Sequence, residues 1–269
     1  MSTVTSKDGT TIAYDKTGTG PALVFVDGAL NSRAMSLAAP IAKAMSQRFT
    51  VYTYDRRGRG ESGDTQPWTL EREIEDLEAL IDAAGGSAYV LGLSSGALLA
   101  LEGAQKLGGK VKKLAVYEAP MILDNSRPPL GQPALAEVKK LIAAGRRDDA
   151  IKFFMKAVDT PRFMIFLMRL MPTWKTVRSY AHTLVYDFEI ASPYQKGAPL
   201  PKSQWATVTV PTWVGVGGKS FTWMKNAQKA LAATLPNASL HELPGQTHIV
   251  RANAIAPELD RFFNDQATS

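Results

Sequence analysis

The pentapeptide Gly92-Leu93-Ser94-Ser95-Gly96 is the segment whose residue types and spacing most directly predict chemistry. An apolar run at 88–91 precedes it and a run of small residues at 97–107 follows it, which predicts a strand, a tight turn and a helix. In that context the strained turn pushes the hydroxyl of Ser94 outwards, and the two glycines let strand and helix pack closely. The helix N-terminus favours negative charge, as an oxyanion intermediate of acyl transfer requires. The pattern predicts a nucleophilic serine, although the pentapeptide alone is also compatible with a plain glycine-serine turn.

A serine hydroxyl needs a base to take its proton, and the chain has three histidines, His182, His241 and His248. His248 lies in the loop that leaves the last predicted strand, 239–243, which places it at the same carboxyl edge of the sheet as Ser94. His241 lies inside that strand, where we expect a packed or surface ring. His182 lies in a helical segment, where a solvated ring is expected. We therefore predict that His248 is the general base.

The composition narrows the chemistry further. A chain of 269 residues with 45% hydrophobic and 21% charged residues is typical of a globular protein with a substantial core. The sequence has no cysteine, which excludes disulfides, thiolate nucleophiles and thiolate metal ligands. Its histidines are too scattered for a histidine-rich metal site, so we expect no metal.

Charge and hydropathy bear on partners and location. The net charge of +6 favours solubility and a mild attraction to anionic substrates, and no nucleic-acid-binding motif accompanies it. No apolar run approaches the ~20 residues that span a bilayer, and the polar N-terminus has no apolar signal region. We expect a soluble, cytoplasmic protein that acts on a small molecule and binds neither nucleic acid nor membrane.

The elements that must position Ser94 and His248 alternate between strand and helix in the first part of the chain. Predicted strands lie at 10–15, 22–26, 49–54, 88–91 and 113–117. Predicted helices between them lie at 35–47, 70–84 and 97–107. This alternation with short connections predicts a parallel sheet flanked by helices.

The alternation is interrupted after residue 120. From 121 to 205 the pattern predicts only helices, at 134–144, 148–157, 163–170 and 176–188. Strands and helices then alternate again, at 207–216, 223–235, 239–243 and 254–265. We predict one α/β core, formed by 1–120 and 206–269, that carries a helical insertion at 121–205.

These features resemble the α/β-hydrolase fold superfamily, in particular its cap-containing serine hydrolases. The segment Tyr54-Asp55-Arg56-Arg57-Gly58-Arg59-Gly60-Glu61-Ser62 matches that family's Asp-x-Arg-Gly-x-Gly-x-Ser loop, and the nucleophile precedes the histidine along the chain. The resemblance covers essentially the whole sequence. It implies an eight-stranded, mostly parallel sheet flanked by helices, a helical cap inserted after strand 6, and no cofactor. It also implies that the backbone amides of Ala29 and Ser95 form an oxyanion hole.

Two positions depart from the family pattern. Asp27 precedes Gly28-Ala29 where the family usually has histidine, and we expect its carboxylate to hydrogen-bond locally and brace the loop. Ser220 occupies the position after the seventh strand where the family usually carries the triad acid. Some family members, including one group of haloalkane dehalogenases, have a glutamate after the sixth strand instead, and Glu118 lies there. The resemblance therefore implies Glu118 as the acid, with a purely structural role in binding loop or cap amides as the alternative.

Aromatic side chains in the insertion and after the seventh strand are candidates for lining an apolar substrate pocket. They are Phe154, Phe163, Phe166, Trp174, Phe221 and Trp223. At helical spacing such residues also pack against the domain beneath, and an exposed apolar cap surface makes a homodimer an open alternative. These aromatic residues favour a small to medium, mostly apolar substrate.

The combined interpretation is a serine esterase-type hydrolase that cleaves an ester, thioester or lactone. Ser94 attacks the carbonyl, His248 accepts and returns the proton, and Glu118 holds the histidine tautomer. Two alternatives stay open. A degenerate hydrolase would bind a ligand with little turnover, and a lyase or carbon–carbon hydrolase would use the same three residues differently.

Overall fold

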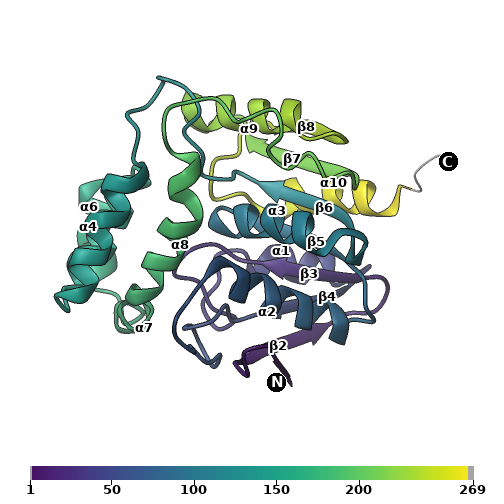
Figure 1. Ribbon diagram of the computed structural model, residues 1–269, viewed down its shortest axis with the longest axis horizontal. Coiled ribbons are helices and arrows are strands. Elements are labelled where there is room, and N and C mark those ends of the chain that lie inside the picture. Colours follow the sequence, from purple (N-terminus) through teal and green to yellow (C-terminus); the bar gives the residue numbers. More distant parts are fainter. Residues whose placement is uncertain (1, 266–269) are drawn as a thin grey trace.

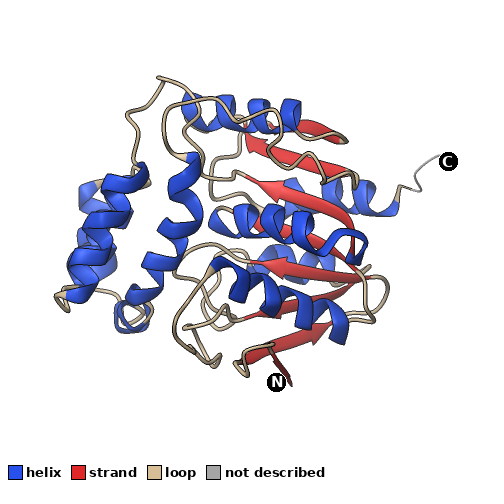
Figure 2. Ribbon diagram, viewed as in Figure 1, coloured by secondary structure: helices blue, strands red, loops and turns tan. Residues whose placement is uncertain are grey.

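The computed structural model describes residues 2–265 and has a central sheet with helices on both faces (Figures 1 and 2). The eight strands lie in the order β1-β2-β4-β3-β5-β6-β7-β8. Their bounds are β1 (Ser2–Thr5), β2 (Thr11–Thr17), β3 (Ala22–Val26), β4 (Thr50–Tyr54), β5 (Ala88–Leu93), β6 (Val111–Tyr117), β7 (Thr212–Gly217) and β8 (Ala238–Leu243). Strand β2 is antiparallel to β1 and β4, and all other neighbours are parallel. The predicted eight-stranded, mostly parallel sheet is confirmed.

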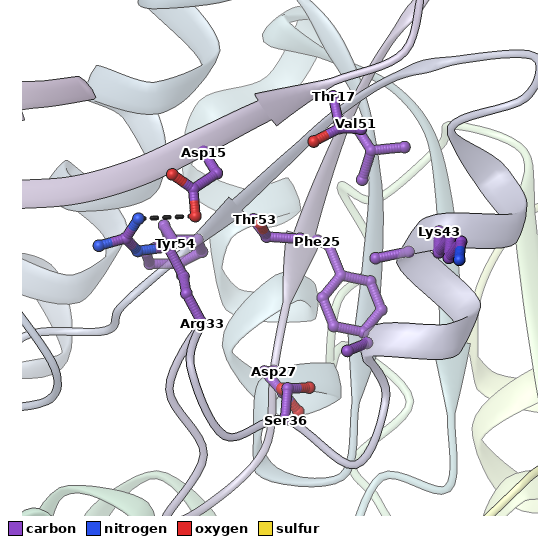
Figure 3. Close-up of a pocket in the computed structure, with 12 residues that line it drawn as sticks. Asp15, Thr17, Phe25, Asp27, Arg33, Ser36, Lys43, Val51, Thr53 and Tyr54 are labelled. Atoms are coloured by element: carbon purple, nitrogen blue, oxygen red, sulfur yellow. Dashed lines mark hydrogen bonds and ion pairs between the residues drawn. The ribbon is translucent and has the colours of Figure 1, made fainter. Parts of the chain in front are cut away.

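One face of the sheet is covered by α1 (Ala39–Met45) and α10 (Ala252–Asn264), which contact each other. Their buried apolar residues form one cluster with β3, β4 and β6 side chains. On this face a cavity of about 210 Å³ lies between α1 and strands β2 to β4 (Figure 3). Asp15, paired with Arg33 at 2.7 Å, lines the cavity together with Asp27 and Lys43.

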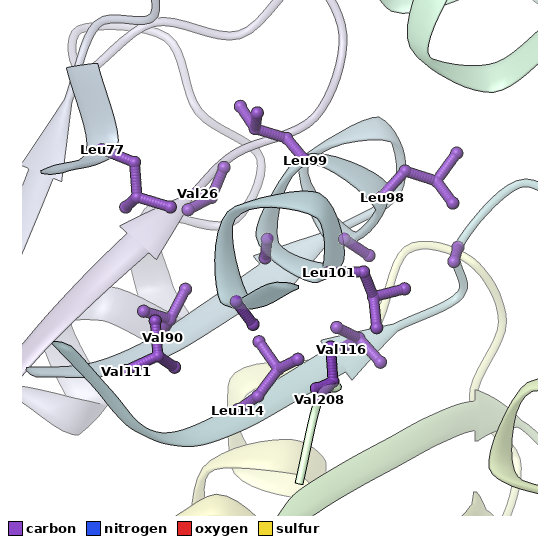
Figure 4. Close-up of a cluster of buried hydrophobic side chains, with 14 of the residues drawn as sticks. Val26, Leu77, Val90, Leu98, Leu99, Leu101, Val111, Leu114, Val116 and Val208 are labelled. Atoms are coloured by element: carbon purple, nitrogen blue, oxygen red, sulfur yellow. The ribbon is translucent and has the colours of Figure 1, made fainter. Parts of the chain in front are cut away.

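The other face carries α2 (Leu70–Ala83), α3 (Ser95–Leu107) and α9 (Thr222–Thr234). Helix α3 is central here, and its leucines pack with side chains of β3, β5 and β6 in the core cluster of Figure 4. The parallel strands are covered on both sides, which explains why they read as continuous apolar runs rather than as alternating patterns. This packing fixes the N-terminus of α3 against the carboxyl end of β5.

Between β6 and β7 the chain forms helices only. They are α4 (Gly131–Ala143), α5 (Arg147–Ala157), α6 (Arg162–Arg169), α7 (Trp174–Ser179) and α8 (Leu184–Ala191). Short 3-10 turns flank α8 at Ala181–Thr183 and Ser192–Tyr194, and another precedes β6 at Gly108–Lys110. We call the helices α4 to α8 the cap. Helix α8 contacts α2 and α3 of the core as well as α4 and α5, whereas α4, α6 and α7 lie beyond it (Figure 1). The boundaries of core and insertion, 1–120 with 206–269 and 121–205, stay a prediction.

Several predicted bounds differ from the structure, such as the helix predicted at 35–47, which spans Ala39–Met45, and two of the differences have identifiable reasons. The helix expected at 176–188 is two helices, because the hydroxyl of Thr183 donates to the carbonyl of Tyr180 and accepts a hydrogen bond from Arg59, which interrupts the helix there. The strand expected from 207 begins only at Thr212, after Pro211, which cannot donate to the sheet. Strand β1 was not predicted, since three of its four residues are polar and its mostly exposed side chains lie on an edge strand.

None of the helices between residues 2 and 265 is long and apolar enough to cross a membrane.

Candidate active site

The predicted strand–turn–helix at Ser94 is present and strained. Ser94 follows β5 and has φ +54° and ψ −128°, a conformation that residues other than glycine rarely adopt. The glycines on either side are required by close packing: a Cβ on Gly92 would lie 2.5 Å from the carbonyl oxygen of Gly96. On Gly96 it would lie 2.3 Å from the carbonyl oxygen of Val26. Steric exclusion therefore explains the glycine spacing that the sequence shows.

Replacing Gly96 by alanine is expected to destabilise the fold by about 1–3 kcal/mol or more, because the atoms in the way belong to backbone that cannot rotate aside. The added methyl group would also displace the backbone of residues 26 and 27, so any catalytic activity at Ser94 should fall together with stability. Gly109→Ala is the matched control, since a Cβ there meets nothing within 4 Å. Urea unfolding of both variants tests this, and equal stabilities would contradict the packing argument.

Glu118 and His248 form a pair. Nδ1 of His248 lies 2.8 Å from Oε2 of Glu118, and the glutamate side chain is fully buried whereas the histidine is 44% exposed. Glu118 follows β6 with φ +50°, and its other carboxylate oxygen accepts hydrogen bonds from the backbone N–H of Gly217, at 2.8 Å, and from the hydroxyl of Ser220. Ser220, at the position where the resemblance places the usual triad acid, thus donates a hydrogen bond to the carboxylate of Glu118.

Topology places Ser94, Glu118 and His248 at the same edge of the sheet. Ser94 follows β5, Glu118 follows β6, and His248 lies in the loop after β8, so all three lie at the carboxyl edge of a parallel part of the sheet. Figure 2 shows the arrowheads of the parallel strands β3 and β6 on the side where α8 lies. Among residues 2–265, neither Ser94 Oγ nor His248 Nε2 makes a hydrogen bond, so each is available to the other or to a substrate. Hydrogen bonds of this kind are often formed only in the substrate complex.

The loop after β3 approaches the same serine. A Cβ on Gly28 would lie 3.7 Å from Ser94 Oγ, and the backbone N–H groups of Ala29 and Ser95 donate to no atom of the described residues. Asp27 braces this loop as expected: Oδ1 accepts from the N–H of Gly28, at 2.7 Å, and Oδ2 accepts from the hydroxyl of Ser36. Burial raises the pKa of Asp27, and these hydrogen bonds partly offset the rise.

The three arginines of the 54–62 segment are buried in ion pairs rather than solvated. Arg57 binds Asp76 through two nitrogens, and also binds Asp8. Arg56 binds both carboxylate oxygens of Glu73, at 2.7 and 2.8 Å. The side chains of the three arginines are at most 1% exposed. Burial at this level requires paired charges, which explains the acidic residues on α2 that face inwards.

Asp187 on α8 is a functional candidate that the sequence analysis missed. Its Oδ1 accepts hydrogen bonds from Arg56 and from the hydroxyl of Ser95, both at 2.8 Å, and its Oδ2 accepts from Arg59 at 2.7 Å. Asp187 is 3% exposed. The signal in the sequence was a single carboxylate within the apolar run Leu184-Val-Tyr-Asp-Phe, on the face of the helix that packs against the core.

Replacing Asp187 by asparagine should make stability depend less on pH. Burial alone raises the pKa of Asp187, but the charges of Arg59 and Arg56 outweigh it and hold the pKa below its ordinary value. The carboxylate therefore stabilises the fold above the unfolded pKa of about 4, and this stabilisation is lost as pH falls through the lowered pKa. We expect Asp187→Asn to cost about 3–5 kcal/mol at neutral pH, with a smaller difference from the wild type at pH below about 4.

Urea unfolding at neutral and acidic pH measures this difference. Glu189→Gln is the control on the same helix, because Glu189 is partly exposed in an ion pair with Lys139 and should contribute less than about 1 kcal/mol. A cost for Asp187→Asn that stays constant from pH 7 to about 3 would contradict the assigned ionisation.

The other two histidines have different contacts, with Trp213 and with Asp64. His241 is on β8, stacked on Trp213 with ring centroids 5.2 Å apart, and burial lowers its pKa. His182 is not the solvated ring that was expected: it is 27% exposed and lies 3.2 Å from a carboxylate oxygen of Asp64. Within residues 2–265 no group of three or more histidine or carboxylate side chains is placed to hold a metal ion.

The six candidate pocket aromatics occupy different surroundings. Phe154 and Trp174 pack against the apolar cluster inside the cap, and Trp223 lies beneath the guanidinium of Arg127, 4.5 Å from the ring centroid. Phe163, Phe166 and Phe221 are 67%, 60% and 57% exposed. The cavity of Figure 3 includes Asp27 but neither these aromatics nor Ser94, Glu118 or His248. Their role in binding substrate stays a prediction.

Comparison with known proteins shows similarity over nearly the whole chain. The sequence model described as the alpha/beta hydrolase family matches residues 23–258. The crystal structure of an alpha/beta hydrolase from Sphaerobacter thermophilus is 44% identical, with a TM-score of 0.88, and the match covers 98% of this chain and 100% of that one. An enol-lactonase from Burkholderia xenovorans shares the fold at 20% identity, with a TM-score of 0.71 and coverage of 98% and 100%.

A curated relative matches over a shorter segment. The 3-oxoadipate enol-lactonase 1 of Acinetobacter baylyi is 32% identical over 101 residues, which are 36% of this chain and 37% of that protein. The match thus spans only about a third of that relative's length.

Proposed function

Since the chain belongs to the alpha/beta hydrolase family, we propose that it is a serine hydrolase that cleaves an ester, thioester or lactone by acyl transfer through Ser94. The observation that carries the proposal is the contact of 2.8 Å between His248 Nδ1 and the buried carboxylate of Glu118. This contact orients the imidazole with Nε2 free of other partners among the described residues. Such a histidine is suited to act as a base for a neighbouring hydroxyl.

The reaction follows from these roles. Ser94 Oγ attacks the carbonyl carbon while Nε2 of His248 takes the hydroxyl proton, and Glu118 stabilises the imidazolium that forms. The N–H groups of Ala29 and Ser95 donate to the oxyanion. The tetrahedral intermediate collapses, the leaving oxygen or sulfur takes the proton from His248, and an acyl-Ser94 ester remains. Water then attacks this ester with His248 again as base, which releases the acid and restores the serine.

A small to medium, mostly apolar substrate is supported by the surface around this edge. Ile249, next to His248, is 64% exposed, and Phe221, next to Ser220, is 57% exposed. Exposed apolar side chains at a catalytic edge favour an apolar acyl or alcohol part. The lactonases among the similar proteins support including lactones in the substrate class.

A second candidate is a ligand-binding protein that turns over slowly. The observation that favours it is the lack of a hydrogen bond between Ser94 Oγ and His248 within the part of the chain that the structure describes. A base that never engages the hydroxyl would leave the serine unreactive.

Labelling with a fluorophosphonate separates these candidates. We expect the folded protein to gain the mass of one adduct, with the modified peptide containing Ser94, and heat-denatured protein to remain unlabelled. Hydrolysis of a panel of 4-nitrophenyl esters, acyl thioesters and small lactones then defines the substrate class. An unlabelled folded protein that hydrolyses none of them would overturn the proposal in favour of ligand binding.

A further inference from the structure

The carboxylate of Asp187 links the cap to both backbone amides that would bind the oxyanion. On one side its Oδ1 accepts the hydroxyl hydrogen of Ser95 at 2.8 Å, and Ser95 supplies one of the two amides. On the other side its Oδ2 accepts from Nη2 of Arg59 at 2.7 Å. The same guanidinium donates from Nη1 to the carbonyl oxygen of Gly28 at 2.6 Å.

The hydrogen bond to Gly28 acts on the second amide. The carbonyl of Gly28 and the N–H of Ala29 belong to one planar peptide unit, so holding the oxygen also sets the direction of the N–H. A cation bound to the carbonyl withdraws electron density from the peptide and makes its N–H a stronger donor. Arg59 is itself held by Asp187 and by the hydroxyl of Thr183. The position of the Arg59 side chain therefore depends on the N-terminal half of α8 and the residue before it, both in the cap.

Ser95 is the first residue of α3, and its side chain is held while its N–H is free. The hydroxyl also lies 3.4 Å from Nη1 of Arg56. Anchoring the side chain limits rotation of the backbone at the turn after Ser94. Both amides are thus restrained by one buried carboxylate that comes from the cap and not from the core.

We propose that Asp187 is a positioning residue for the oxyanion hole, through which helix α8 of the cap aligns the amides of Ala29 and Ser95. The inference rests on the proposed serine hydrolase function. It predicts that stabilisation of the oxyanion depends on how the cap packs against the core. The cap then contributes to the rate of the chemical step and does not only enclose the substrate.

Glu73 provides a matched control, because it has the same charge and a similar environment. It is 1% exposed and pairs with Arg56, as Asp187 does, but its hydrogen bonds within residues 2–265 go only to Arg56 and Trp68. Glu73→Gln and Asp187→Asn each remove one carboxylate from the same buried set of charges. If the set only holds the fold together, the two variants should behave alike.

The experiment compares wild type, Asp187→Asn, Glu73→Gln and Ser95→Ala in fluorophosphonate labelling rate and in kcat and KM for 4-nitrophenyl butyrate. We expect Asp187→Asn to lower the labelling rate and kcat by about 10- to 100-fold, with KM changed less than about threefold, because the oxyanion forms only in the transition state. The labelling rate and kcat of Glu73→Gln should stay within about threefold of wild type, although its loss of thermal stability should be comparable to that of Asp187→Asn. Ser95→Ala, a mild change at a helix start, should lower kcat by about tenfold.

The pH dependence distinguishes alignment of the amides from an effect on the base. The midpoint of the kcat–pH profile should be the same in wild type and Asp187→Asn, since the base keeps its partner Glu118. Equal losses in Asp187→Asn and Glu73→Gln, or a wild-type rate in Ser95→Ala, would overturn the inference. If Asp187→Asn does not fold, Ser95→Ala and Glu73→Gln decide it alone. A wild-type protein that is not labelled at all would overturn the proposed function, and this inference with it.

Discussion

Ser94→Ala is expected to eliminate the fluorophosphonate adduct and to lower kcat for any ester or lactone that the wild type hydrolyses by about 10⁶-fold, the size of loss seen when a serine protease loses its nucleophile. The methyl group of alanine cannot form the acyl intermediate, so only the oxyanion amides and substrate binding remain. Stability should change little, since Ser94 Oγ makes no hydrogen bond within residues 2–265. The strained φ of +54° is unchanged by this substitution.

The neighbouring serine provides the control for this result. Ser95→Ala leaves Ser94 in place, so an adduct should still form, more slowly and at the same peptide. Intact mass and peptide mapping measure both variants. An adduct that persists in Ser94→Ala but disappears in Ser95→Ala would show that the nucleophile has been assigned to the wrong serine.

Glu118→Gln should lower kcat by about 10⁴-fold, by analogy with the loss that follows removal of the acid from a serine protease triad. The amide preserves the shape of the side chain, but it cannot stabilise an imidazolium and it favours the wrong tautomer of His248. Two hydrogen bonds that Glu118 accepts, from Gly217 and Ser220, also lose their charged acceptor. We therefore expect reduced thermal stability together with the loss of activity.

Ser220 supplies two tests of this assignment. Ser220→Ala removes a hydrogen bond to Glu118 but leaves the carboxylate, so its effect on kcat should be less than about tenfold. Adding Ser220→Asp to Glu118→Gln returns a carboxylate to the position that is usual in the family, and part of the activity should recover. Measured kcat within tenfold of wild type for Glu118→Gln alone would exclude Glu118 as the acid.

Much of the fold could be predicted because its signals are local. The turn at Ser94 needs glycines two positions away on each side, and steric exclusion by Val26 and Gly96 enforces this spacing. Strands covered on both faces need continuous apolar runs, as in β3 and β7. The position of His248 after the last strand followed from the same pattern. Prediction was weaker where a side chain interrupts a helix, as Thr183 does between α7 and α8.

The site could be predicted only in part. Asp27, Glu118 and Ser220 all carried ambiguous signals, because a carboxylate or hydroxyl at the carboxyl edge can brace a loop, bind an amide or orient a histidine. The candidate aromatics were selected by residue type, and their exposure ranges from packed in the cap to 67% for Phe163. Composition and periodicity describe what a side chain is, but not which atoms surround it.

The sequence by itself determined the turn at Ser94, the alternation of strand and helix and the loop that carries His248, since each depends on residues within a few positions of one another. Only the tertiary structure shows which carboxylates contact His248 and Ser95. Glu118 meets His248 across 130 positions of the chain, and Asp187 meets Ser95 across 92. The role of a carboxylate depends on its partners and on the exclusion of water around it. Both are properties of the packed core and cap, so no local pattern of residues encodes them.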